Sequence, residues 1–207
     1  MFRDRTDAGR QLAEAMADRG VSPELVLAIP RGGLPPGRAV ADHFDAPLGV
    51  VVAKKLGAPN NPELALAAVA EDGSVWRNDE LLARLDVTDE YVDAERVRVG
   101  DEARETAERY RDGAFPSLRD RRVAIVDDGI ATGATMRACL ARVRAAEPAS
   151  IAVGVPVGPA DTIDDLGASA DTVVCVETPA AFRAFGAYYR NFGQVSDEEA
   201  MGYLASE

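Results

Sequence analysis

The sequence predicts an α/β protein built on a doubly wound, mostly parallel β-sheet. Short apolar segments recur at 25–29, 48–53, 122–126, 151–155 and 173–176, and segments of helical character separate most of them. Strands that are apolar throughout, rather than alternating, are typical of parallel sheets covered by helices on both faces. With 207 residues, 47% of them hydrophobic, we expect a single domain over 1–207 with a substantial core.

The N-terminal part begins this alternation. Thr6 or Asp7 can cap a first helix, in which apolar residues recur at helical spacing. The first buried strand follows at 25–29. A second helix is expected over 36–43, because proline is tolerated in a first helical turn. The segment 48–53 then predicts a second buried strand.

The middle of the chain departs from the simple alternation. Apolar segments at 64–70 and 74–77 flank Glu71-Asp72-Gly73, which predicts a hairpin. A charged helix is expected over 88–111. We therefore interpret 57–116 as a loop, hairpin and helical elaboration of the single domain.

The C-terminal part returns to the parallel sheet. The strand 122–126 leads into a loop and a helix that extends to residue 145, and a helix at 161–166 separates the last two strands. The segment 182–192 contains five aromatic residues. We expect 178–207 to form a hood that covers a ligand, or else a packing element, since aromatic residues are first of all core material.

Composition and charge exclude several classes of protein. The net charge of −12 argues against a nucleic-acid partner, which needs a basic surface. The longest apolar run is too short for a bilayer, and charges replace the apolar core of a signal peptide, so we expect a cytoplasmic protein without a membrane partner. With one histidine and two isolated cysteines, Cys139 and Cys175, no dedicated metal site is predicted.

Three unusual loops follow predicted strands: Arg31-Gly32-Gly33, Lys54-Lys55 and 127–135. In doubly wound sheets, ligands bind outside the carboxyl ends of the strands. Lys54 and Lys55 are the only lysines among 23 basic residues, and their placement at a strand end would deliver two ammonium groups to this edge. We therefore expect a site for an anionic ligand there.

The third loop carries the clearest chemistry, in the stretch VAIVDDGIATGATM at 123–136. Asp127 and Asp128 follow a buried strand, and both can serve one ligand only if the strand ends there. Thr132-Gly133-Ala134-Thr135 then offers free amides and hydroxyls at a helix N-terminus, which favours an anion. Carboxylates beside an amide nest suit a ligand with both hydroxyls and a phosphate.

This stretch closely resembles the signature of the type I phosphoribosyltransferases, which bind phosphoribosyl pyrophosphate (PRPP). The resemblance implies that Asp127 and Asp128 bind the ribose hydroxyls and that Gly129 and the residues Ala131, Thr132, Gly133, Ala134 and Thr135 hold the 5′-phosphate. It also implies Mg²⁺ as a cofactor that arrives with PRPP, through Asp127 or Asp128 at most, without a cage of protein ligands.

The resemblance extends more weakly to the other two loops. Arg31, Gly32 and Gly33 match the family's pyrophosphate loop, and Lys54 and Lys55 match a basic position after the next strand. The expected function is transfer of the phosphoribosyl group from PRPP to a small nitrogenous acceptor, with a nucleobase as the favoured class. Position 131 is alanine where 6-oxopurine enzymes of the family carry an aspartate, which leaves the acceptor open. We also expect a homodimer or a higher homo-oligomer.

Five alternative interpretations compete with this function or with parts of it. A plain strand–turn–helix would use Asp128 or Thr132 as an N-cap, and a plain turn explains Arg31-Gly32-Gly33 equally well. A receiver domain needs a lysine downstream of its acidic pair, and none follows Lys55. A P-loop requires lysine followed by serine or threonine. A non-catalytic regulator that binds PRPP stays open as the second functional class.

Overall fold

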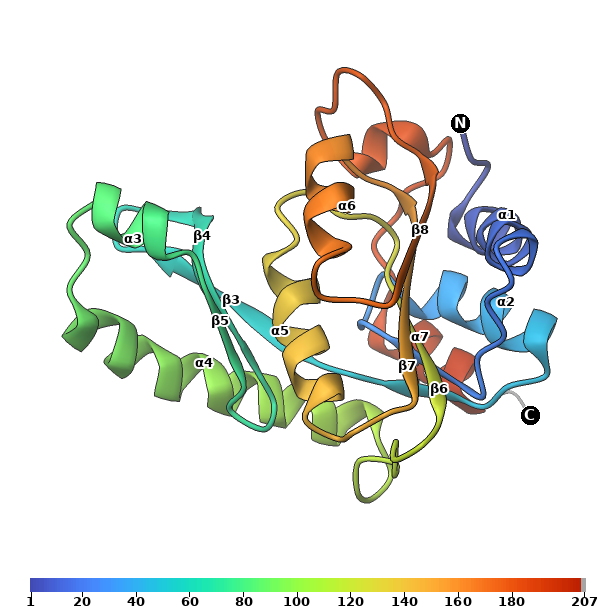
Figure 1. Cartoon of the computed structure of the whole chain (residues 1–207), viewed down its shortest axis with the longest axis horizontal. Coiled ribbons are helices and arrows are strands. Elements are labelled where there is room, and N and C mark those ends of the chain that lie inside the picture. The colour runs from blue at the N-terminus through green and yellow to red at the C-terminus, as the bar shows by residue number, and fades with distance from the viewer. Residues whose placement is uncertain (206–207) are drawn as a thin grey trace.

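The computed structural model describes residues 1–205, without the side chain of Glu63, and confirms the α/β fold class (Figure 1). Five parallel strands form the main sheet in the order β2-β1-β6-β7-β8. Their bounds are β1 Leu25–Ala28, β2 Leu48–Val50, β6 Arg122–Val126, β7 Ser150–Val157 and β8 Thr172–Glu177. Because β1 lies between β2 and β6, the strand order reverses around β1, and the crevice outside this reversal is where such folds bind ligands.

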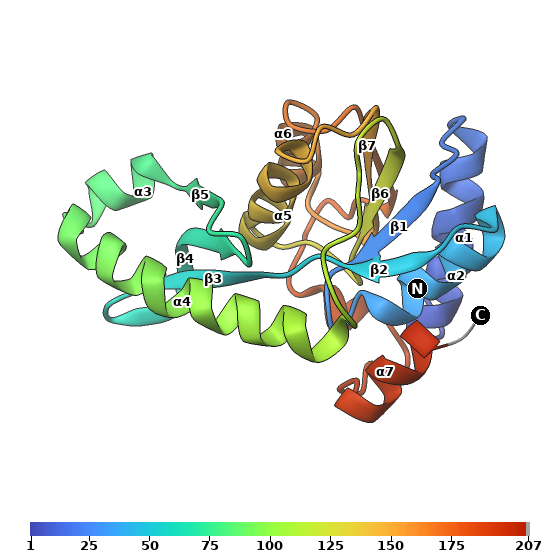
Figure 2. The ribbon, with the colours of Figure 1, turned by 90° about the horizontal axis from the view of Figure 1, so that it is seen from below.

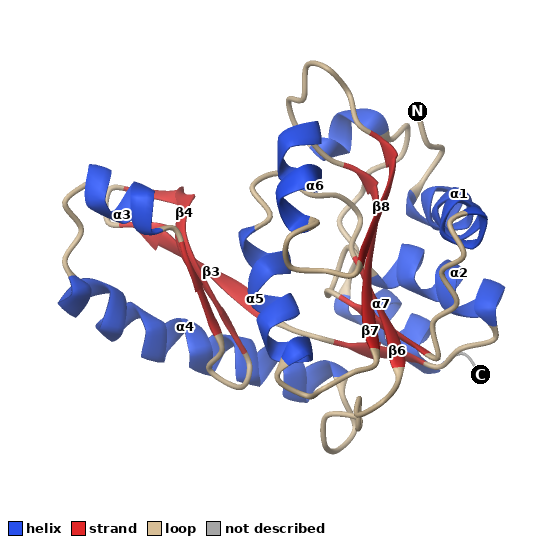
Figure 3. Cartoon of the chain, in the orientation of Figure 1, coloured by secondary structure: helices blue, strands red, loops and turns tan. Residues whose placement is uncertain are grey.

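Helices cover both faces of this sheet, so the domain has three layers (Figures 1 and 3). Helices α1 (Arg5–Asp18) and α2 (Leu34–Phe44) pack on one face, and α5 (Ala134–Arg144) and α6 (Ala160–Leu166) pack on the other. Alternate residues of β6 divide between the two cores: Val123 and Ile125 face α5, whereas Ala124 and Val126 face α1 and α2. Burial on both faces explains why these strands are apolar throughout.

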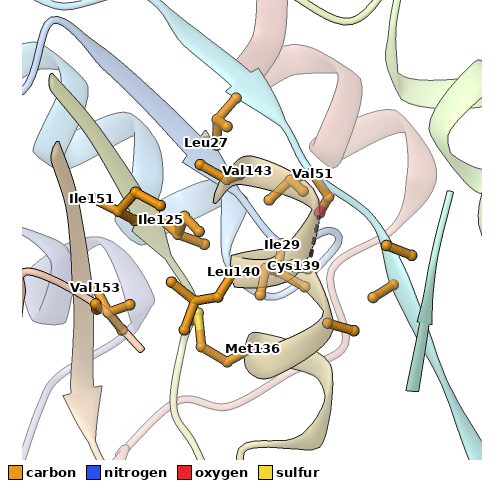
Figure 4. Packing of buried hydrophobic residues seen from close by; sticks show 14 of the residues in the cluster. Leu27, Ile29, Val51, Ile125, Met136, Cys139, Leu140, Val143, Ile151 and Val153 are labelled. Carbon is orange, nitrogen blue, oxygen red and sulfur yellow. Dashed lines mark hydrogen bonds between the residues drawn. The ribbon is translucent and has the colours of Figure 1, made fainter. Parts of the chain in front are cut away.

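The hydrophobic core between α5 and the main sheet also includes residues that follow β2 (Figure 4). Met136, Cys139 and Leu140 of α5 pack against the strands, and Val51, just after β2, belongs to the same cluster. The Cys139 thiol lies 4.0 Å from the Val51 carbonyl oxygen. Burial raises the pKa of Cys139 well above its usual value, so this thiol is a packing element.

The elaboration forms an arm that projects from the main sheet (Figures 1 and 2). Its antiparallel sheet has the order β3-β4-β5, with β3 Ala53–Ala58, β4 Asn61–Ala70 and β5 Val75–Arg77. Helices α3 (Asp79–Arg84) and α4 (Asp89–Tyr110) pack on it, and α5 contacts it from the other side. The hairpin and the long helix were predicted, whereas α3 was not, because its six residues carry little periodicity.

The C-terminal segment that follows β8 is called the hood. It contains a short 3₁₀ helix, η1 (Phe185–Tyr188), and a last helix, α7 (Asp197–Ala205). Tyr189 forms a bridge with Phe2 near the N-terminus. Within the described residues 1–205, no helix is both long and apolar enough to cross a membrane.

Two local predictions were wrong. The first helix is capped by Asp4, whose carboxylate accepts from the Asp7 amide, and not by Thr6 or Asp7. The predicted strand 48–53 is two strands, β2 and β3, because β1 ends at Ala28 and leaves the extended chain without a partner in the main sheet beyond Val51. From Ala53 onward, β3 pairs with Ala70 and its neighbours on β4 instead.

Candidate active site

A pocket of about 400 Å³ lies at the carboxyl ends of β1 and β6. Two loops meet there: the β1 loop, residues 30–33, and the β6 loop, residues 127–135. They adjoin because β1 and β6 are neighbours, with Ala28 opposite Val126 and the Ile29 amide bonded to the Val126 carbonyl. The pocket is lined by these loops, the start of β3, helix α1 and the hood: Arg5, Ile29, Pro30, Arg31, Gly32, Ala53, Lys54, Lys55, Asp127, Asp128, Thr135, Phe185, Phe192, Gln194 and Val195.

The two carboxylates are adjacent in sequence but differ in their surroundings. Strand β6 ends at Val126, so both side chains can turn toward the pocket, as predicted. Asp127 is partly exposed, and its Oδ1 accepts from the Asp128 amide at 2.8 Å. Asp128 is only 6% exposed. As a whole residue, Asp127 is therefore the more exposed of the two, and its second carboxylate oxygen has no hydrogen-bond donor among the described residues.

Asp128 is held by contacts from three directions. Its Oδ2 accepts from Arg5 Nε at 2.6 Å, and its backbone carbonyl accepts from the Tyr189 hydroxyl at 2.6 Å. The backbone of Gly32 packs so closely that a Cβ there would lie 2.3 Å from Asp128 Oδ2. Asp128 thus links helix α1 and the β1 loop through its carboxylate, and the hood through its backbone carbonyl.

Arg5 is a pocket residue that the sequence alone did not reveal. Besides its ion pair with Asp128, its Nη1 donates to the Gly193 carbonyl at 2.6 Å, and its guanidinium lies 3.7 Å from the centre of the Phe192 ring. Its side chain is 12% exposed. Nothing near Arg5 in the sequence marks it, because its partners are more than a hundred residues away.

Burial raises the pKa values of both carboxyl groups, and repulsion between them adds to the shift of Asp127. Burial, with the charge of Asp128 second, raises the pKa of Asp127 well above its usual value. Burial also raises the pKa of Asp128, although Arg5 opposes that shift. The pocket by itself therefore disfavours the charged form of Asp127, and a cation or hydroxyl donor bound beside it would favour that form.

The β1 loop depends on its glycines for this close packing. A Cβ on Gly33 would lie 2.6 Å from the Ile29 carbonyl and 2.7 Å from the Val126 carbonyl. Only glycine fits at 32 and 33, so the loop can lie directly against the ends of β1 and β6. The loop contains a cis peptide bond between Pro30 and Arg31. Arg31 Nη1 donates to Asp197 Oδ1 of α7 at 3.0 Å.

The β6 loop ends in an open helix N-terminus. Gly133 adopts the left-handed conformation (φ +74°) directly before α5. Among residues 1–205, the amides of Ala131, Thr132, Gly133 and Thr135 have no hydrogen-bond acceptor, whereas the Ala134 amide has only a long contact of 3.5 Å to Thr132 Oγ1. Within that range, no side chain from another element accepts a hydrogen bond from these amides, which suits an anion.

The lysines lie within β3 rather than at the end of a parallel strand, which corrects the prediction. Both nonetheless line the same pocket as Asp127 and Asp128. Lys54 is partly buried and its side chain has no hydrogen bond or ion pair to any described residue, whereas Lys55 is exposed. An ammonium group without a partner beside a pocket is available to an anionic ligand.

The hood contributes aromatic rings to the pocket. Phe185 and Phe192 form an edge-on pair with ring centres 5.8 Å apart. The Phe185 side chain lies against Gly129, where a Cβ would be 2.7 Å from Phe185 Cβ. Glycine at 129 thus permits contact between the β6 loop and the hood.

The predicted site residues divide into two groups. Seven line the pocket: Arg31, Gly32, Lys54, Lys55, Asp127, Asp128 and Thr135. The other six belong to the same two loops but do not line the pocket: Gly33, Gly129, Gly133 and Ala134 are buried, and Ala131 and Thr132 are exposed. Sequence reasoning missed Arg5, Gln194 and the Tyr189 contact, and only the aromatic cluster at 182–192 hinted at the hood.

The donor set fits a metal ion that arrives with its own ligands. Among the described residues, no three His, Cys, Asp or Glu side chains converge as a metal site would require. Asp127 offers one carboxylate oxygen without a hydrogen-bond donor among the described residues, while Asp128 is bound to Arg5. Mg²⁺ commonly binds through one or two carboxylates together with phosphate oxygens and water.

These features define the class of protein: an α/β domain with an acidic pair and an open amide loop side by side at a strand-order reversal. The phosphoribosyl transferase domain model matches residues 4–190, and the chain belongs to this family. Its fold is that of the type I phosphoribosyltransferases.

Individual relatives support the same assignment. The chain is 43% identical over 206 residues to "Putative phosphoribosyl transferase Rv0571c" of Mycobacterium tuberculosis H37Rv and, equally, to MT0597 of strain CDC 1551. These matches cover 99% of this chain but 46% of the relatives, so it spans about half their length. The crystal structure of TT1426 from Thermus thermophilus superposes with a TM-score of 0.83 at 41% identity, covering 99% of this chain and 97% of that one.

Proposed function

We propose that this domain binds PRPP and transfers its phosphoribosyl group to a nitrogenous acceptor, with release of pyrophosphate. The observation that carries this proposal is that one pocket is lined by Asp127, by the cationic Arg31 and Lys54, and by Thr135 at the open N-terminus of α5. That arrangement matches a ligand with hydroxyls at its centre and phosphates at both ends. Family membership supports the transferase class.

In the proposed binding mode, the 5′-phosphate lies at the N-terminus of α5. Thr135 adds a hydroxyl at the pocket wall. The dipole of α5 and its unpaired amides favour a phosphate dianion. The ribose hydroxyls would then donate to the Asp127 carboxylate, because Asp128 already accepts from Arg5.

The diphosphate would extend toward the β1 loop and β3. There Arg31, Lys54 and Lys55 provide the positive charge. Compact, rotatable ammonium groups suit a leaving group whose charge moves as it departs. Arginine at position 31 provides several donors in a fixed plane, so it can hold Asp197 and a phosphate oxygen together.

The chemical step breaks the bond between ribose C1 and the diphosphate oxygen and forms a bond from C1 to the acceptor nitrogen. Pyrophosphate leaves with the electron pair, and the acceptor nitrogen loses its proton. The residues act by placement and electrostatics: Lys54 and Arg31 stabilise the departing charge, and the carboxylate of Asp127 stabilises the positive ribose ring. Mg²⁺, held by Asp127 and the ligand, would supply further neutralisation of the diphosphate.

The acceptor would enter beneath the hood. Phe185 and Phe192 line this side of the pocket and offer surfaces for a planar ring. Ala131 provides no carboxylate toward the acceptor. A nucleobase remains the favoured acceptor class, and the cytoplasmic location and the homo-oligomer stay predictions.

The experiment is calorimetric titration of PRPP with Mg²⁺, followed by a pyrophosphate-release assay across purine and pyrimidine bases. Micromolar binding with release that depends on one class of base supports a transferase. Binding without release for any acceptor would favour the alternative, a regulator that binds PRPP without turnover. Absence of PRPP binding would contradict both.

A further inference from the structure

Helix α7 lies beyond residues 4–190, which the family model matches, yet it contacts the β1 loop. Asp197, its first residue, accepts from Arg31 Nη1 at 3.0 Å. The Tyr110 hydroxyl at the end of α4 donates to the same oxygen, Asp197 Oδ1, and Arg109 Nη1 lies 3.5 Å from the other oxygen. Three elements distant in sequence therefore meet at one carboxylate.

The position of Asp197 is itself fixed. Ser196 and Glu199 form a reciprocal capping pair: the Ser196 amide donates to Glu199 Oε2 at 2.8 Å, and the Glu199 amide donates to Ser196 Oγ at 3.1 Å. Val195 and Ala200 are buried with Leu34 of α2 and Tyr110 of α4. The start of α7 is thus anchored beside the start of α2, directly after the β1 loop.

We propose that Asp197 is a positioning residue that holds the Arg31 guanidinium toward the diphosphate of PRPP. This inference rests on the proposed function. Asp197 uses one of the five N–H donors of Arg31, so the other donors stay available to the ligand. Tyr110 holds the Asp197 carboxylate in turn, which makes the α4–α7 contact a support for the β1 loop.

The contact has little value for stability alone. The side chains of Arg31 and Asp197 are 34% and 49% exposed, and exposed ion pairs contribute little to folding. Loss of the Arg31–Asp197 contact can therefore change ligand binding without changing the stability of the fold. A positioning role is also separable from simple electrostatics, because removing a negative charge near a polyanion should strengthen binding, whereas loss of positioning should weaken it.

The test compares Asp197→Asn with Glu198→Gln by calorimetry of PRPP and Mg²⁺. Glu198 is the matched control, since it lies in the same first turn, is exposed and has no side-chain hydrogen bond or ion pair to another described residue. We expect Asp197→Asn to raise Kd about 2- to 10-fold, the cost of ordering one freed side chain, with Tm unchanged. Glu198→Gln should bind like the wild type. Equal or tighter binding by Asp197→Asn would overturn the inference.

Two further variants keep the test decisive. Tyr110→Phe removes only the hydroxyl and should weaken PRPP binding in the same direction by a smaller factor, even if Asp197→Asn disturbs α7. In an Arg31→Ala background, Asp197→Asn should have no further effect, and an undiminished effect there would also overturn the inference. A wild-type protein that binds no PRPP would instead remove the proposed function itself, before any variant is compared.

Discussion

The β1 loop and the β6 loop follow neighbouring strands and face one pocket, but they are held in place differently. Distant residues hold the start of the β6 loop at Asp128, but its second half takes its shape from its own sequence, with a left-handed glycine at 133 and the N-terminus of α5. The β1 loop relies on distant parts of the chain, since Gly32 packs on Asp128 and Arg31 binds Asp197. A loop shaped by residues next to it in the chain has a recognisable sequence pattern. A loop held by residues far away in the chain has none.

The largest expected effect comes from a substitution that breaks the contact between the two loops. Gly32→Ala places a Cβ 2.3 Å from Asp128 Oδ2, so the carboxylate and its partner Arg5 must shift. Displacement of binding groups by about 1 Å can cost about 100-fold, and we expect PRPP binding to weaken by that factor. Gly202→Ala is the matched control, because its Cβ would meet nothing within 4 Å. Calorimetry that finds Gly32→Ala unaffected would disprove the close packing.

The second prediction separates the two carboxylates by stability. Asp128→Asn leaves Arg5, 12% exposed, without its anionic partner, and breaking a buried pair costs about 3 kcal/mol or more. Asp127→Asn should instead stabilise the ligand-free protein at neutral pH, because burial and Asp128 raise the pKa of Asp127. Both variants should also weaken PRPP binding, by a smaller factor than Gly32→Ala does. Chemical denaturation measures the two changes, with the exposed Asp93→Asn as a neutral control.

The pH dependence gives this prediction a definite sign. A carboxyl whose pKa is higher in the folded state contributes stability that is complete below its unfolded pKa of about 3.9 and is lost as pH rises through the folded pKa. The advantage of Asp127→Asn over the wild type should therefore be small in acid and grow toward neutral pH. A constant difference across this range would show that Asp127 is not destabilised by burial.

The third prediction concerns the lysines that face both loops. Lys54→Arg with Lys55→Arg keeps the positive charge but replaces compact ammonium groups with planar guanidinium groups. We expect an unchanged Tm, PRPP binding within about tenfold and turnover lower by about 100-fold, as for other losses of transition-state contacts. Steady-state kinetics on the accepted base provide the measurement. Wild-type turnover in the double variant would make the lysine pair incidental.

The smallest effect is expected at the β6 loop, where backbone amides provide most of the proposed contacts. Thr135→Val removes one hydroxyl and leaves the amides in place, so PRPP binding should weaken only about 2- to 10-fold. Thr106→Val, on α4 away from the pocket, should change nothing. A loss as large as that of Gly32→Ala would mean that the loop depends on side chains, contrary to the comparison of the two loops.

The fold could be predicted from the sequence because the patterns that indicate its strands, helices and turns lie within short segments. Apolar strands such as 122–126 and 151–155 are buried on both faces, and the turn after Ala70 marks the hairpin. The break between β2 and β3 was missed because it is set by where β1 ends, which the segment 48–53 does not encode.

The same distinction applies to the candidate site. Asp127 and Thr135 were predicted because strand end, acids and helix start follow one another in the chain. Arg5 and Asp197 were missed, because no sequence pattern around either residue indicates that it contacts the site. Their importance depends on contacts across more than a hundred residues.

The most direct test of the central claim is a crystal structure of the protein with PRPP and Mg²⁺. We expect the 5′-phosphate within hydrogen-bond distance of the amides between Ala131 and Thr135, a ribose hydroxyl on Asp127, and the diphosphate beside Arg31 and Lys54. A 5′-phosphate bound elsewhere, or a diphosphate at the N-terminus of α5, would contradict the assignment of the two loops.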